Sequence, residues 1–202
     1  MSSAKVHLSA EEWKLVTDSQ VILTKNSVME KVVALMAGLS EGYRPVWEAV
    51  EGTKVGTLLM AGLGPASPKI SRGENYRGLP WVMLDYPRYF GKEDVFAIRT
   101  MFWWGHAFSV TLHLKGRYRE QFLSGVEKNW TVLATAGFHV GISEDEWRHE
   151  HAPDNYEAMR AAVDVKRTGD FLKLSSAVGL HRWEDAPEEL MSMFKTLISV
   201  LF

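Results

Sequence analysis

The chain has 202 residues, of which 23 are Lys or Arg and 25 are Asp or Glu, so its formal net charge is −2. This near balance argues against partners held by bulk charge, and we expect neither nucleic acid nor a membrane surface as a partner. At 46% apolar and 24% charged residues the composition is that of a globular protein, and the length favours one domain over residues 1–202.

Cysteine is absent, which excludes disulfides, thiolate nucleophiles and cysteine-ligated metal centres. A cysteine-free chain fits a reducing compartment, and residues 1–7 lack the apolar core of a secretion signal. The longest apolar run, residues 95–104, contains Arg99 and is only about half of the roughly 20 residues that a membrane-spanning helix needs. We therefore expect a cytoplasmic protein.

Helix starts are predicted where a Ser or Asp stands three residues before a Glu, the spacing of a capping box. The five pairs are Ser9/Glu12, Ser27/Glu30, Ser143/Glu146, Asp154/Glu157 and Asp185/Glu188. Apolar residues at helical spacing over residues 28–39 and 190–201 indicate buried helix faces. A further helix is predicted from about residue 118 to residue 136, ending at Gly137.

Strands are predicted where β-branched and aromatic residues cluster or alternate with polar ones. These segments are residues 79–86, 95–103, 107–114, 138–142 and 171–180. The short connection at residues 104–106 predicts an antiparallel hairpin between the second and third of them. The expected fold class is α+β, a single domain with a mainly antiparallel sheet of about five strands and the N- and C-terminal helices packed on one face.

Residues 62–78 are rich in Gly, Pro and basic residues and are expected to form a long loop inside the domain. Pro65 and Pro68 argue against a dinucleotide-binding loop here, because that motif must open directly into a helix. We expect no cofactor. The cations Arg72 and Arg77, with Tyr76 as a stacking face, are candidates for closing over an anionic ligand, and a solvated surface loop is the alternative.

The predicted hairpin register decides which side chains share a face of the sheet. It places Arg99 opposite Thr111, with Ser109 and His113 on the same side two residues away. A guanidinium in an otherwise apolar strand needs an acceptor, and Asp85 on the preceding strand is the candidate.

Two interpretations of this polar face stay open. In the first, Arg99 and Asp85 form a structural ion pair on a half-covered sheet. In the second, the face is a pocket rimmed by Trp81 and Trp103, where Arg99 grips a carboxylate or phosphate and His113 donates or shuttles a proton.

Three histidines, His139, His149 and His151, form the only group with a metal-site character. The Ser143/Glu146 pair predicts that His149 and His151 lie on a helix, where residues two apart point about 200° away from one another. Such a pair cannot share one ion, so a metal site needs His139 or His181 brought in by the fold, or a helix that has already ended, and we assign no metal ligands.

The leading hypothesis is a small-molecule binding protein that recognises an anionic, planar ligand on the polar sheet face. One alternative is an enzyme that uses His113 as a general acid or base in the same pocket. The other is a structural protein that forms a homodimer through exposed Trp residues and the C-terminal helix.

Overall fold

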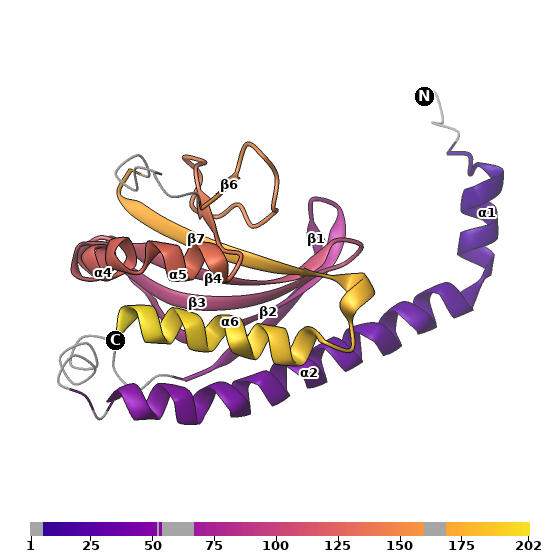
Figure 1. The fold of residues 1–202 in the computed structure, drawn as a ribbon. Helices are drawn as coiled ribbons and strands as arrows, with labels where there is room; N and C mark the ends of the chain where they lie inside the picture. Colours follow the sequence, from indigo (N-terminus) through magenta and orange to yellow (C-terminus); the bar gives the residue numbers. More distant parts are fainter. Residues whose placement is uncertain (1–5, 52, 54–66, 160–168) are drawn as a thin grey trace.

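The computed structural model describes residues 6–51, 53, 67–159 and 169–202. Its centre is one antiparallel sheet of seven strands in the order β1-β2-β3-β4-β7-β5-β6 (Figure 1). The strands are β1 (Lys69–Tyr76), β2 (Leu79–Phe90), β3 (Val95–Trp103), β4 (Ala107–Lys115), β5 (His139–Gly141), β6 (Tyr156–Ala158) and β7 (Phe171–Gly179). The α+β class and the antiparallel sheet predicted from the sequence are confirmed.

The hairpin of β3 and β4 has the predicted register. Arg99 pairs with Thr111 and Met101 pairs with Ser109, so the odd-numbered side chains of both strands share one face. Strand β7 pairs with β4 and adds Lys173 to the same face. The chain turns between the two strands through Gly105, whose positive φ of 74° suits a residue without a Cβ.

Two strands were not predicted, and one predicted loop is wrong. Residues 69–76 form β1, which pairs antiparallel with β2, whereas residues 62–66 of the expected loop lie outside the described residues. Strand β1 is an edge strand whose side chains are largely exposed, so the sequence KISRGENY carries no apolar run to reveal it. Only residues 77–78 make the turn into β2.

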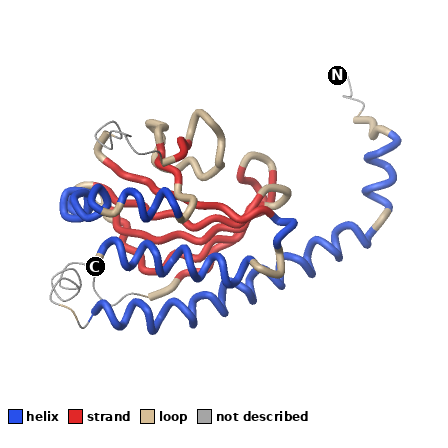
Figure 2. The backbone as a smooth tube through the Cα atoms, viewed as in Figure 1, coloured by secondary structure: helices blue, strands red, loops and turns tan. Residues whose placement is uncertain are grey.

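The even-numbered side chains of β3, β4 and β7, and of β2 as far as Tyr86, face the helices and form the core. The helices are α1 (Ala10–Thr17), α2 (Ser19–Glu51), α4 (Arg117–Lys128), α5 (Trp130–Thr135) and α6 (Ala186–Leu201), with a short 3-10 helix η2 (Leu180–Arg182) before α6. Helices α2 and α6 lie side by side on this face, as Figure 2 shows. Tyr43 of α2 stacks on Phe194 of α6 with ring centroids 3.8 Å apart, and its hydroxyl lies 3.1 Å from the Thr100 hydroxyl of β3.

The predicted capping boxes have mixed outcomes. The box at Ser9 and Glu12 starts α1 as predicted, with both reciprocal hydrogen bonds present. The start at Ser27 is wrong, because α2 already runs from Ser19 and the residues before Ser27 are helical as well. Asp185 does precede α6, although its side chain makes no capping hydrogen bond.

The two remaining boxes are wrong, because neither pair starts a helix. Ser143 accepts a hydrogen bond from the Asp145 amide at 3.1 Å, and Asp145 accepts one from the Trp147 amide at 2.9 Å. The pair Asp154/Glu157 precedes strand β6. Short polar side chains can cap an isolated turn as well as a helix, so this spacing alone does not separate the two.

The single helix predicted over residues 118–136 is divided into α4 and α5 at Asn129. The Asn129 amide side chain donates to the Gly125 carbonyl at 2.9 Å, a local bond that competes with the regular helical pattern. Gly137 follows α5 with a φ of 76°, as a helix-ending glycine should. None of the helices in the described part of the chain is long and apolar enough to cross a membrane.

Candidate functional site

The second face of the sheet carries a polar strip across its middle strands. Thr111 and Ser175 are cross-strand partners whose hydroxyl oxygens are 2.7 Å apart. His113 pairs across the strands with Lys173, and both side chains are almost fully buried. Buried polar groups need partners, and none of the described helices covers this face to provide them.

The segment that covers the strip is the loop between β5 and β6, residues 142–155, which we call the covering loop (Figure 1). Glu146 accepts from Lys115 at 2.7 Å and lies 2.9 Å from the His113 ring nitrogen. Lys173 donates to the backbone carbonyl of Arg148. The covering loop is therefore attached to β4 and β7 through charged side chains rather than through an apolar seam.

The covering loop also reaches the opposite edge of the sheet. Glu150 accepts hydrogen bonds from Tyr76 of β1, from Arg77 at 2.5 Å and from Arg148 at 2.6 Å. The Tyr76 hydroxyl accepts in turn from the backbone amide of His149 at 2.7 Å. With anchors at β1 and at β7, the covering loop spans the sheet and encloses the polar strip.

Arg99 and Asp85 form an ion pair beneath this cover, with the guanidinium Nε 2.7 Å from the carboxylate Oδ1. Their side chains are 13% and 7% exposed, so the pair is shielded from solvent. The guanidinium also lies over the rings of Phe90 and Trp147, at 5.2 and 5.7 Å from their centroids. This geometry matches the structural ion pair that the sequence left as one of two interpretations.

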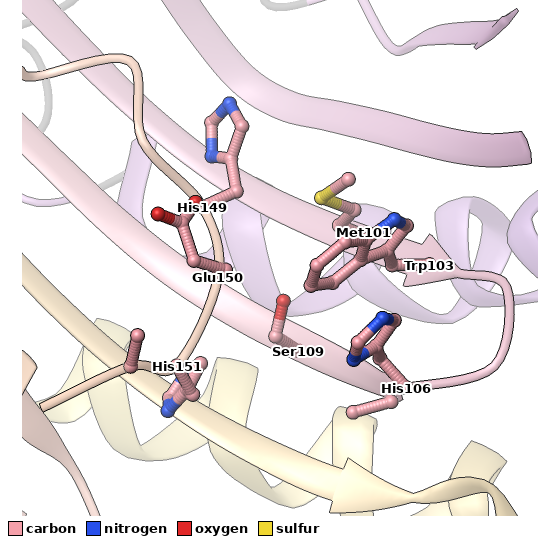
Figure 3. Close-up of a pocket in the computed structure, with 9 residues that line it drawn as sticks. Met101, Trp103, His106, Ser109, His149, Glu150 and His151 are labelled. Carbon is pink, nitrogen blue, oxygen red and sulfur yellow. The ribbon is translucent and has the colours of Figure 1, made fainter. Parts of the chain in front are cut away.

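A pocket of about 360 Å³ remains open where the covering loop meets the ends of β3 and β4. Figure 3 shows Trp103 and His106 on one side of it, His149, Glu150 and His151 on the other, and Ser109 between them. The complete lining is Met101, Trp103, His106, Ala107, Ser109, His149, Glu150, His151 and Ala152.

One wall of the pocket is flat and aromatic. The His106 ring stacks on Trp103 with centroids 3.5 Å apart and planes 9° apart. Trp103 is held in place by a hydrogen bond from its indole nitrogen to the Tyr76 carbonyl at 3.2 Å, and by an edge contact with the Tyr76 ring. A rigid aromatic surface at a pocket wall suits a planar ligand.

The facing wall holds two imidazoles in a positive electrostatic environment. Burial lowers the pKa of His149 well below its ordinary value, and the charges of Arg99 and Lys173 lower it further. Burial, followed by the nearby His139 and Lys173, lowers the pKa of His151 to about 4. Both rings are therefore neutral near pH 7. The His151 Nε2 atom lies 2.9 Å from the Ser175 hydroxyl, so only its other ring nitrogen can bind a ligand.

Lys173 and His113 lie under the covering loop and are perturbed in the same way. Burial lowers the pKa of Lys173 to about 8, and the nearby Arg99 charge adds to the effect. Burial also lowers the pKa of His113 to about 3, with Lys173, Arg99 and Lys115 as the contributing cations. Burial is the main cause of both shifts, and the neighbouring cations add to it.

The structure brings together part of the predicted site. Trp103 and Ser109 line the pocket, and Trp81 is the cross-strand neighbour of Trp103. Other predicted residues lie just outside the lining: Tyr76 and Arg77 hold Glu150, while Arg99, Asp85, Thr111 and His113 lie under the covering loop. Arg72 is exposed on β1, opposite Val82.

The residues of the covering loop that line the pocket were not predicted from the sequence. His149 and His151 were placed on opposite sides of a helix, which is wrong, because residues 142–155 are not helical and both rings line the same pocket. The alternation of His149, Glu150 and His151 was the available signal, since in an extended segment residues two apart share a side. Within the described residues, no group of three or more His, Asp or Glu side chains could hold a metal ion.

No protein-family model matches this chain, and the searches of curated proteins and of solved structures found no match either.

Proposed function

We propose that the protein binds a small, planar, anionic molecule in the pocket between the covering loop and the ends of β3 and β4. The observation that carries the proposal is the pairing of a flat Trp103–His106 wall with two neutral imidazoles that face it. The volume of about 360 Å³ lies within the range of small-molecule sites, roughly 300 to 1,000 Å³. The proposal keeps the cytoplasmic location expected from the sequence.

The charge distribution supports an anion. Arg99 is neutralised by Asp85. Lys173, in contrast, forms no ion pair with a carboxylate among the described residues, and its charge lies close enough to lower the pKa of His149 and to attract a carboxylate or phosphate. An anion bound there would raise the pKa of His149 and His151 toward their ordinary value. Binding is therefore accompanied by proton uptake below the ordinary pKa of 6.5, and affinity increases as the pH falls from about 6.5 toward 5.

The ligand groups follow from the two walls. The indole and imidazole rings of Trp103 and His106 provide a stacking surface for a planar ring. His149, His151 and Ser109 provide hydrogen bonds to its polar edge. Glu150 is already held by three donors, so it shapes the pocket rather than repelling the ligand.

The test is a thermal-shift and tryptophan-fluorescence screen with matched pairs of planar acids and their neutral amides, such as nicotinate with nicotinamide and benzoate with benzamide. A ligand that binds the folded state raises the melting temperature. We expect some acids to stabilise the protein more than their amides do, and His106→Ala to weaken that effect. His181→Ala, at an exposed histidine in η2 away from the pocket lining, is the control.

Two results would contradict the proposal. The first is an absence of any stabilisation across a broad panel of planar acids. The second is a ligand effect that survives His106→Ala and Ser109→Ala unchanged, since both residues line the pocket. The second result would leave binding intact and assign it to another surface.

Catalysis by His113 gains no support from the geometry. Its side chain is fully buried, and its Nε2 atom lies 2.9 Å from the Glu146 carboxylate rather than at the pocket surface. A general acid or base must come within hydrogen-bond reach of the substrate. Turnover of a ligand identified by the screen would reopen the enzymatic alternative, with His149 and His151 as the groups to replace.

A further inference from the structure

The N-terminal part of the chain leaves the body of the molecule and carries unburied apolar side chains. Helix α1 has no buried residue, and the first turns of α2 continue past the edge of the sheet (Figure 1). We call residues 6–23 the N-terminal arm. Its exposed apolar residues are Val6, Leu8, Trp13, Leu15, Val16, Val21, Ile22 and Leu23.

The exposed area of the N-terminal arm is large for a surface that stays in water. The eight residues are 41% to 89% exposed, which amounts to about 800 Å² per chain if each has an accessible area on the order of 150–250 Å². Stable protein interfaces bury about 800 Å² on each partner. Isolated apolar side chains on a surface are normal, but eight of them concentrated within residues 6–23 indicate an interaction site.

Helix α2 carries a stripe that connects the N-terminal arm to the body. Val21, Val28 and Leu35 are spaced by seven residues, which is close to two helical turns, so they lie along one side of α2. Val28 and Leu35 are partly buried against the core edge, whereas Val21 is 41% exposed. A seven-residue apolar stripe is the pattern by which one helix packs along another.

Next to this stripe is an apolar groove of about 620 Å³ between α2 and α6. Gly38 lines it, and a Cβ atom built at Gly38 would meet nothing within 4 Å. The absence of a side chain there keeps the groove open beside Leu35 and Trp183. The complete lining is Lys31, Leu35, Gly38, Leu39, Trp183, Pro187, Glu188 and Met191.

We propose that a second copy of this chain covers both surfaces. If two α2 helices pack antiparallel about Val28, Val21 of each copy lies opposite Leu35 of the other, because the two positions are equally far from Val28. In the same arrangement residues 17–25 of each copy lie at the level of the groove residues 31–39 of the other. The contact is self-complementary, so each N-terminal arm fills one groove and the assembly closes as a two-fold dimer.

The dimer explains the two surfaces together, which a separate partner for each would not. On α2, Val21, Ile22 and Leu23 of the N-terminal arm lie five to seven positions before Val28, and the groove residues Lys31, Leu35 and Gly38 lie three to ten positions after it. If both arms are covered, their exposed apolar area of about 800 Å² each matches the roughly 1,600 Å² of a standard interface. The inference is independent of the ligand proposed above, because none of these residues lines that pocket.

The first experiment is size-exclusion chromatography with light scattering on the full chain over a range of protein concentrations. A dimer of twice the chain mass of 22.9 kDa is expected. Val21→Glu places a charge in the stripe and Gly38→Glu fills the groove, and each should raise the dimer dissociation constant about tenfold or more. Val132→Glu, at an exposed valine of α5, is the matched control and should leave the dimer intact. Circular dichroism verifies that every variant is folded.

A cross-link tests the arrangement of the two copies. The chain has no Cys, so a single introduced cysteine reports on one position alone. Val28→Cys should cross-link to its counterpart with a short bismaleimide, because Val28 lies at the two-fold axis. Val132→Cys should not.

Three results would overturn the inference. The wild-type chain could be monomeric at every concentration. A dimer could form but be insensitive to both Val21→Glu and Gly38→Glu, which would place the interface elsewhere. A monomer that sediments with lipid vesicles, and loses that property in Val21→Glu, would assign the N-terminal arm to a membrane surface instead.

Discussion

Replacing Asp85 by Ala leaves the Arg99 guanidinium without its carboxylate beneath the covering loop. The two groups are 2.7 Å apart, and the side chains of Arg99 and Asp85 are only 13% and 7% exposed. Two unit charges about 4 Å apart attract by roughly 4 kcal/mol at the effective dielectric constant typical of proteins. Removing one partner of a shielded pair costs about 3–5 kcal/mol, because the remaining charge stays buried. We therefore expect Asp85→Ala to lower the free energy of unfolding by that amount.

A double-mutant cycle separates the loss of the pair from the loss of packing. In Asp85→Ala with Arg99→Met neither charge remains, and the Met side chain keeps much of the contact with Phe90 and Trp147. The double variant should be more stable than Asp85→Ala alone by about 2 kcal/mol or more. Urea unfolding followed by tryptophan fluorescence and by circular dichroism measures all four proteins.

The reasoning would be refuted by either of two results. If Asp85→Ala costs less than about 1 kcal/mol, the pair behaves like a solvated surface pair and the covering loop does not shield it. If the effects of the two single substitutions simply add in the double variant, the two charges are not coupled.

Three further predictions concern acid stability, the core and a turn. Burial lowers the pKa of His113 from 6.5 to about 3, so below pH 6.5 the unfolded chain binds a proton that the folded chain does not. The free energy of unfolding should therefore fall by about 2 kcal/mol at pH 5, and by less in His113→Gln. Urea titrations at pH 7.5 and pH 5 measure both proteins. Phe194→Ala removes the ring stacked on Tyr43 and should cost about 3–5 kcal/mol in the same assay, whereas a loss below about 1 kcal/mol would contradict the packing. A Cβ atom at Gly137 would meet only Ser176, at 3.6 Å, so the cost of Gly137→Ala comes from the φ of 76° alone. We expect a loss of about 1 kcal/mol and a few degrees of melting temperature. An unchanged melting temperature in calorimetry would contradict this.

The strands that are buried on both faces could be predicted from the sequence, because their side-chain patterns are local. The hairpin of β3 and β4 has apolar side chains at every second position and a short connection, so its register, and the shared face of Arg99 and Thr111, could be predicted. Helix α6 was accessible for the same reason, through its apolar spacing. Strand β1 was not, because an exposed edge strand has no apolar alternation.

Only half of the pocket could be predicted from the sequence. Trp103 and Ser109 follow from the hairpin register, but His149, Glu150 and His151 belong to a loop whose path has no sequence period. The Ser143/Glu146 spacing indicated a helix there, since the same side chains can cap either a helix or a turn. The choice between them depended on what lay beneath the loop.

The sequence by itself determined the α+β class, the β3–β4 register and the pairing of a guanidinium with threonine on one sheet face, because each rests on the alternation of neighbouring side chains. Only the tertiary structure decided that Arg99 forms its ion pair with Asp85 and that His113 contacts Glu146. It also decided that the open pocket lies next to Met101 and Ser109, the next cross-strand pair on this face after Arg99 and Thr111. The two contacts of Arg99 and His113 join residues 14 and 33 positions apart in the chain. Buried charges are stabilised by groups that the fold brings close in space, and the local sequence pattern does not show which groups these are.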